Sequence, residues 1–152
     1  MGAITQEIRE FVNKVKLGFV ATVSPDGTPN LSPKGTTIAW DEDHLAFADI
    51  HSPGTVTNLL NNSSIEINVV DIFTRKGYRF KGKGEVYSEG TIFESVVSYF
   101  RDAGSKHVIK NIVLVKVDRI IQLMSPAYDL NPSEAEITNR WIEYWNSIHP
   151  EK

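Results

Sequence analysis

Residues 17–36 read LGFVATVSPDGTPNLSPKGT, and this stretch decides the fold. Residues 19–24 are rich in β-branched side chains, which favour strands. The segment SPDG at residues 24–27 follows with turn chemistry, because proline presets φ and glycine accepts the left-handed conformation. Residues 29–38 return as a partner strand whose two prolines suit a strand end or edge. The pattern predicts an antiparallel hairpin.

A second stretch, FADIHSPGTVTNL at residues 47–59, predicts a strand that runs directly into a helix. Ser52 is the expected N-cap, and Pro53 suits the first helical position. A helix N-terminus offers unpaired N–H groups and a partial positive charge, which together bind phosphate. Two interpretations stay open at this junction. One is a plain helix cap, and the other is an anion site to which Ser52 and Thr55 contribute hydroxyls and Lys34 a charge.

The rest of the chain continues the same alternation of short strands and isolated helices. We expect six strands, at residues 19–24, 29–38, 44–48, 65–71, 78–87 and 109–123. We expect four helices, at residues 5–16, after Ser52, after a capping box formed by Thr91 and Glu94, and after a cap formed by Ser133 and Glu136. Strands without regular βαβ alternation favour an antiparallel sheet, closed into a barrel. No G-x-G-x-x-G motif follows a strand, which argues against a Rossmann dinucleotide site.

Length and composition indicate one globular domain over residues 1–152. The net charge of −3 argues against a nucleic-acid binder, since such proteins are usually basic over the binding face. The absence of cysteine excludes disulfides and thiol nucleophiles, so redox chemistry requires a bound cofactor. Residues 1–6 lack the pattern of a signal peptide, and no apolar run has the length to span a bilayer. We expect a soluble, cytoplasmic protein without a membrane partner.

The four histidines are scattered and show no metal-ligand spacing, so we expect no metal site. His51 differs from the others because it lies in the loop before the short helix. There it either contacts a ligand or is merely nearby.

Two further patterns each have a structural and a functional interpretation. Basic residues alternate with apolar or small ones from Lys76 to Lys83, and a solvated strand face is favoured over an anion-binding face. An aromatic stripe at residues 141–145 predicts packing of the last helix, either on its own chain or on a partner subunit.

The two stretches together resemble the FMN-binding split-barrel family, the pyridoxamine 5'-phosphate oxidase-like proteins. The pattern apolar–small–Asp–x–x–Ser–Pro–x–Thr–x–x–Asn–Leu at residues 47–59 is similar to the family's strand-to-helix junction. The segment TRKGYRFKG at residues 74–82 resembles a later strand of the family, and SPAYDL at residues 125–130 matches more weakly. The resemblance implies a mainly β fold, a six-stranded antiparallel split β-barrel of Greek-key type with flanking helices. It also implies a homodimer with FMN at the subunit interface.

The resemblance also implies which residues contact the cofactor. Those expected at the phosphate end are Ser52, Thr55 and Asn58. Those expected along the ribityl chain and the ring are Ser32, Pro33, Lys34, Gly35 and Thr36. Ala48 and Asp49 are expected beside the cofactor, and His51 lies in the candidate cofactor loop. The later strand contributes Lys76 and Gly77. Many family members place a basic residue just before the helix threonine, where this chain has Gly54. We expect Lys34, Arg75 or Lys76 to supply the missing charge.

The expected function is electron transfer through FMN between a reduced donor and a small-molecule acceptor. The sequence does not assign a general acid or base. The alternatives are a non-catalytic flavin carrier or sensor, and a protein that binds another cofactor, such as deazaflavin or haem, on the same fold. A true pyridoxamine-phosphate oxidase is disfavoured, because only Lys152 provides a basic side chain after Arg140, and the expected basic C-terminal motif is absent.

Overall fold

The expected hairpin opens the sheet. In the computed structural model, which describes residues 2–151, β1 (Gly18–Val23) pairs antiparallel with β2 (Pro29–Lys34). Gly27 in the turn has a φ of +83°, a conformation that side chains rarely adopt. The side chain of Asp26 accepts hydrogen bonds from the backbone N–H and the hydroxyl of Thr28, which stabilise the turn.

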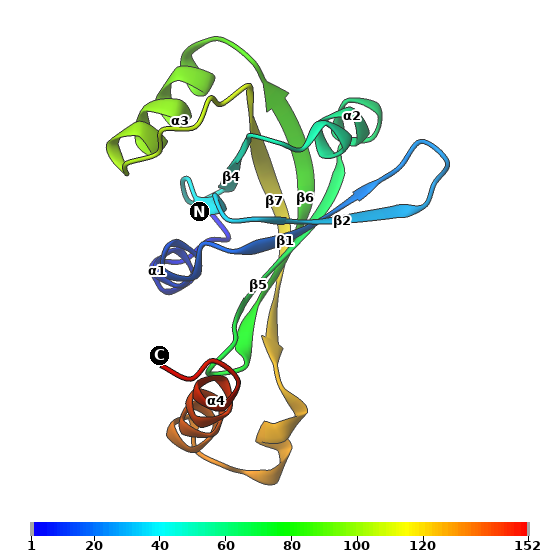
Figure 1. Cartoon of the computed structure of the whole chain (residues 1–152). Coiled ribbons are helices and arrows are strands. Elements are labelled where there is room, and N and C mark those ends of the chain that lie inside the picture. Colours follow the sequence, from blue (N-terminus) through cyan, green and yellow to red (C-terminus); the bar gives the residue numbers. More distant parts are fainter. Residues whose placement is uncertain (1, 152) are drawn as a thin grey trace.

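Seven strands form one sheet in the order β2-β1-β5-β6-β7-β4-β3, with antiparallel pairing throughout. The strands not yet named are β3 (Ile38–Ala39), β4 (His44–Asp49), β5 (Ser64–Asp71), β6 (Lys76–Tyr87) and β7 (Asn111–Met124). Strands distant in sequence are neighbours, since β1 lies beside β5 and β4 beside β7. The sheet curls as a half-barrel with helices along its flanks (Figure 1), which is the mainly β, antiparallel split-barrel fold that the resemblance implied.

The strand count differs from the expected six because the segment at residues 29–38 divides. The chain turns after Lys34, whose carbonyl oxygen accepts a hydrogen bond of 2.9 Å from the Thr37 hydroxyl. Ile38 and Ala39 then pair with β4 as the separate edge strand β3. A run of β-branched residues does not reveal such a break, because the Thr37 side chain that closes the turn also has a high strand propensity.

Among the described residues, the expected caps at Ser52, Thr91 and Ser133 yield one side-chain hydrogen bond to a helix start, at Ser133, and Thr5 provides a further cap that was not expected. The Thr5 hydroxyl accepts from the Ile8 N–H at the start of α1 (Gln6–Val15), and Ser133 does the same from Glu136 before α4 (Glu134–Ile148). The expected capping box at Thr91 is wrong, because Gly90 occupies the N-cap position of α3 (Thr91–Asp102). The helices α2 (Pro53–Asn61) and η1 (Pro126–Leu130) complete the chain. Within residues 2–151, no helix combines the length and hydrophobicity required to cross a bilayer.

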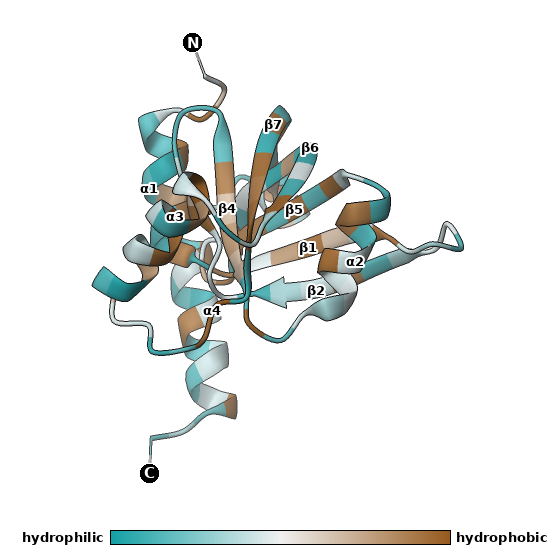
Figure 2. Cartoon of the chain, turned by 90° about the horizontal axis from the view of Figure 1, so that it is seen from above, coloured by the Kyte–Doolittle hydropathy of each residue, from teal (hydrophilic) through white to brown (hydrophobic). Residues whose placement is uncertain are grey.

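Two hydrophobic cores lie on opposite faces of the sheet. Alternation along β4 places Leu45 and Phe47 in the main core with α1 and α2, and Ala46 and Ala48 against α3. Figure 2 shows the corresponding hydrophobic colouring on the strands β4 and β7, in contrast to the more hydrophilic β2. Gly84 explains the close approach of α2, because a Cβ at this residue would lie 3.0 Å from the Leu59 side chain.

The C-terminal helix α4 lies at the far end of the long β6 and β7 strands (Figure 1). The guanidinium of Arg75, in the turn before β6, lies 3.4 Å from the centroid of the Trp141 ring. Ile137 is fully buried, whereas Tyr144 and Ile148 remain about half exposed. The aromatic stripe therefore packs partly on its own chain and leaves a second apolar face open.

Candidate cofactor-binding site

The junction between β4 and α2 forms as the sequence predicts, with Ser52 at the N-cap and Pro53 at the first helical turn. The Ser52 hydroxyl does not cap the helix. Instead it accepts a hydrogen bond of 2.5 Å from Lys34 Nζ. The first backbone N–H groups of α2 therefore keep their capacity to bind an anion.

Lys34 is the central side chain of the candidate site. It ends β2, is only 5% exposed, and also donates to the Ser32 hydroxyl at 2.6 Å. Burial lowers the pKa of the Lys34 ammonium, and the nearby charge of Asp49 opposes that shift. Its hydrogen-bond partners are neutral, so this buried cation is not fully compensated and favours the approach of an anion.

Asp49 is buried and holds the junction in shape. One carboxylate oxygen accepts from the Ser52 backbone N–H at 2.8 Å, and the other accepts from the Asn111 side chain at 3.0 Å. Asp49 and Asn111 are register partners in the β4–β7 ladder. Sequence reasoning missed Asn111, because no local motif shows that a residue 62 positions away faces this carboxylate.

The second-strand segment runs beside the junction. Thr36 Oγ1 accepts from the Ala48 N–H at 2.9 Å, which ties the segment to the end of β4. Pro33 and Gly35 are exposed. A Cβ built at Gly35 or at Gly54 would meet nothing within 4 Å, so both glycines border open space in which a ligand can lie.

Two of the expected phosphate contacts are buried in the first turns of α2. Asn58 donates a buried hydrogen bond of 3.0 Å to Thr22 Oγ1, and so holds the helix on β1. Thr55 is only 3% exposed, whereas His51 is exposed in the preceding loop. Phosphate contacts by Thr55, Asn58 and His51 stay predictions, and the structure adds a packing role for Asn58.

Lys76 and Gly77 lie apart from the other expected contacts. Register pairs lead from Lys34 to Gly18, Val69 and Tyr78, so β6 is three strands away, about 14 Å along the sheet. Lys76 Nζ contacts Glu134 on α4 at 2.9 Å, and this bond raises the pKa of Lys76. One chain therefore does not bring Lys76 and Gly77 to the Lys34 junction.

The preference for glycine at residue 77 has a structural cause. A Cβ at Gly77 would lie 2.2 Å from the backbone oxygen of Val69, closer than any real contact.

Of the three expected sources of the charge missing at Gly54, only Lys34 is in place. Arg75 is stacked on Trp141, and Lys76 is paired with Glu134.

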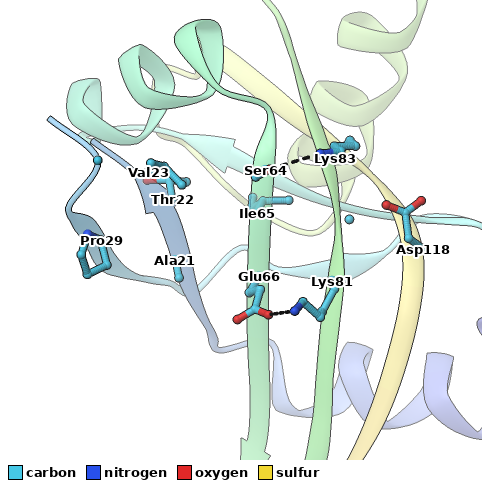
Figure 3. Close-up of a pocket in the computed structure, with 12 residues that line it drawn as sticks. Ala21, Thr22, Val23, Pro29, Ser64, Ile65, Glu66, Lys81, Lys83 and Asp118 are labelled. Atoms are coloured by element: carbon cyan, nitrogen blue, oxygen red, sulfur yellow. Dashed lines mark hydrogen bonds and ion pairs between the residues drawn. The ribbon is translucent and has the colours of Figure 1, made fainter. Parts of the chain in front are cut away.

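The outer face of β1, β5 and β6 carries a separate shallow hollow of about 460 Å³ (Figure 3). Within it, Lys81 pairs with Glu66 at 2.8 Å, and Lys83 donates to the Ser64 hydroxyl at 3.1 Å. None of the expected cofactor contacts lines this hollow. It is therefore distinct from the junction at Lys34.

Comparisons with known proteins agree with this architecture. The protein HupZ from Group A Streptococcus has 34% sequence identity, a TM-score of 0.74, and matches 80% of this chain and 95% of its own. An FMN-binding protein from Syntrophomonas wolfei (16% identity, TM-score 0.67, 80% of this chain and 87% of that chain) shares the fold. The heme storage protein HutZ from Vibrio cholerae (17% identity, TM-score 0.63, 80% and 94%) shares it as well. A search of curated proteins found no match.

The family model described as pyridoxamine 5'-phosphate oxidase matches residues 4–123. These residues contain all seven strands except the last residue of β7, as well as the strand-to-helix junction at Lys34. The chain therefore belongs to the pyridoxamine 5'-phosphate oxidase family.

Proposed function

We propose that the protein binds FMN, with the phosphate at the junction of β2, β4 and α2. The observation that carries this proposal is the buried ammonium of Lys34, which is joined to the hydroxyls of Ser32 and Ser52 at the start of a helix. A cation, two hydroxyls and free helix N–H groups form a donor set that suits a phosphate dianion.

The segment beside Lys34 suits the remainder of the cofactor. Open space at Gly35 and Gly54 allows a ligand to approach the backbone, and the hydrogen bond between Thr36 and Ala48 holds the neighbouring strands in place. FMN supplies electron transfer between a reduced donor and an acceptor, while the protein anchors and orients it.

We further propose that two copies associate and complete the site. Lys76 and Gly77, which the family resemblance assigns to the flavin, lie three strands from Lys34 within one chain. A second chain related by a two-fold axis could present them across an interface. The outer face of β1 and β2 supports this proposal, because Phe19 is 41% exposed and Leu31 is 68% exposed beside a hollow of about 430 Å³.

Haem is a second candidate ligand, favoured by His51. This imidazole is exposed in the loop before α2, and histidine is a common axial ligand of haem iron. The related fold of the heme storage protein HutZ gives this candidate structural precedent.

The deciding experiment is an absorption spectrum of the purified protein, together with mass spectrometry of any ligand that heat releases. Flavin absorption bands and the mass of FMN support the proposal, whereas an intense Soret band supports haem. A colourless protein that also fails to bind added FMN contradicts the flavin assignment. Reduction by NADH or NADPH, followed by reoxidation with an acceptor, separates an oxidoreductase from a flavin carrier that binds without turnover.

The dimer is tested by sedimentation velocity of the wild type and of Leu31→Glu. We expect the wild type to sediment as a dimer and the variant to shift toward the monomer, because a charge would be buried at the interface. Lys106→Glu, on an exposed loop, is the matched control. A wild-type monomer at all concentrations contradicts the shared site but leaves FMN binding itself open to the spectrum.

A further inference from the structure

The outer face of the sheet carries apolar side chains that belong to neither hydrophobic core. One row of directly opposed residues crosses β2, β1, β5, β6 and β7, and its members are Pro33, Phe19, Asn68, Arg79 and Ile121. The next row along the strands contains Val70, Gly77 and Leu123. None of these apolar residues is part of the cores on either side of the sheet. An apolar face of this kind is typical of an interface.

Arg79 lies in the middle of this face and lacks a carboxylate partner. It lines a hollow of about 430 Å³, and its Nε donates to the neutral side chain of Asn68 at 3.2 Å. Among the residues that the structure describes, no carboxylate lies at ion-pair distance from its guanidinium. Glu66, which also lines the hollow, is paired with Lys81 at 2.8 Å. That pair is neutral as a whole, so Arg79 leaves one uncompensated positive charge at the hollow.

A symmetric dimer does not neutralise this charge. In the proposed two-fold interface the second copy presents the same face, so it brings a second Arg79 and a second Glu66–Lys81 pair. The two apolar rows contain no carboxylate that could face the guanidinium. Because a buried cation is costly without an anion beside it, the interface favours a negative group that neither chain supplies.

The position of Arg79 relative to Gly77 indicates which group this is. The two residues share one face of β6, two positions apart, about 7 Å along the strand. The proposed dimer brings Gly77 of the second copy to the flavin, so Arg79 of that copy arrives beside the same ligand. The phosphate end is already held by Lys34, and therefore the ring end of the flavin is the part that remains for Arg79.

We propose that Arg79 acts in trans, in that it contacts the flavin ring bound at the Lys34 junction of the other copy. This inference rests on the proposed FMN site and on the proposed dimer. The guanidinium offers Nη hydrogens in a fixed plane, which suit the carbonyl oxygens of a flat ring. Its charge should also favour the reduced flavin over the oxidised one, because reduction adds negative charge to the ring.

Replacement of Arg79 by glutamine tests this contact through affinity and redox potential. We expect the Kd to rise about threefold for oxidised FMN and about 30-fold for reduced FMN, since the reduced ring carries the charge that Arg79 attracts. A tenfold larger loss for the reduced form lowers the two-electron midpoint potential of bound FMN by about 30 mV. Arg79→Lys keeps the charge and should keep most of the potential. Arg101→Gln, on the exposed side of α3, is the control for the loss of one arginine and should change neither quantity.

Heterodimers separate action in trans from action within one chain. One copy carries Lys34→Met and the other carries Arg79→Gln, and two different affinity tags isolate the mixed dimer. If Arg79 acts in trans, one site of each mixed dimer combines an intact Lys34 with an intact Arg79, and about half of the sites bind with wild-type affinity. If both residues served the flavin of their own chain, every site would carry one substitution and none would recover.

Wild-type binding of FMN with an unchanged Kd and potential in Arg79→Gln overturns this proposal and leaves the flavin site at Lys34 intact. So does a mixed dimer in which no site recovers, or an equal effect of Arg101→Gln. A wild type that fails to bind FMN contradicts the proposed function itself, and the role of Arg79 with it. If Arg79→Gln fails to fold, Arg79→Met, which keeps an aliphatic stem against the apolar face, replaces it in both measurements.

Discussion

Replacement of Lys34 by methionine tests the proposed flavin site most directly. Lys34 is 5% exposed, and the change keeps an unbranched side chain of similar length while it removes the ammonium that contacts two hydroxyls. Loss of one hydrogen bond to a charged group costs about 1.5–3 kcal/mol. At 25 °C this corresponds to a Kd for FMN that is about 10- to 150-fold higher.

The same change should affect the stability of the ligand-free protein in the opposite sense. Lys34 is buried without a directly bonded carboxylate, so its charge is costly to fold in the absence of an anion. We expect the ligand-free Lys34→Met variant to unfold at the same temperature as the wild type or higher. The increase in its unfolding temperature on addition of FMN should be smaller, because stabilisation by a ligand grows with the logarithm of its affinity.

Flavin fluorescence titration measures the Kd, and thermal unfolding with and without FMN measures the stability. Lys106→Met, which removes an exposed lysine elsewhere, is the control for the loss of one charge. A folded Lys34→Met variant with an FMN affinity within twofold of wild type would refute the phosphate assignment. A large loss of stability without ligand would instead show that Lys34 is chiefly a structural residue.

Three further predictions follow from the same geometry. As the pH rises, FMN affinity should begin to fall before pH 10.5, because burial lowers the pKa of Lys34 from that value and the neutral amine does not attract phosphate. Fluorescence titration across pH measures this fall, and Lys34→Met should not show it. In the ligand-free protein the sign is opposite, since a lowered folded-state pKa makes stability rise with pH between that pKa and 10.5. Asn58→Ala should lower the free energy of unfolding by about 1–3 kcal/mol, because the buried hydroxyl of Thr22 loses its partner; urea denaturation measures this, and an unchanged midpoint contradicts it. Gly84→Ala should cost about 1–3 kcal/mol by overpacking against Leu59, whereas Gly54→Ala, which meets open space, should leave the urea midpoint nearly unchanged.

Local chemistry was sufficient to predict the parts of the fold that depend on neighbouring residues. The hairpin around the SPDG turn and the helix start at Ser52 and Pro53 both form as expected. The capping prediction at Thr91 is wrong because Gly90 before it takes a φ of +94° and occupies the N-cap position itself. Sequence patterns place a helix well but its first residue less well, since several nearby residues compete for the same cap.

Long-range pairing determines the features of the candidate site that the sequence did not reveal. Asn111 reaches Asp49 only because β7 pairs with β4, and Thr22 reaches Asn58 only because α2 packs on β1. The sheet order also places Lys76 and Gly77 three strands from Lys34, although the family resemblance groups them in one site. Within a single chain such distances depend on register, which local motifs do not encode.

By itself the sequence determined that this is a cysteine-free, mainly β chain, and it pointed to a candidate anion site at a strand-to-helix junction. These conclusions rest on turn, capping and alternation preferences, which act over a few residues. Only the tertiary structure decided that Lys34, rather than Arg75 or Lys76, supplies the charge at this junction, and that Phe19, Asn68 and Arg79 form one row on the outer face. Both facts depend on which strands become neighbours. Strand pairing is determined by the burial of the hydrophobic faces of the whole sheet, not by the residues of any one segment.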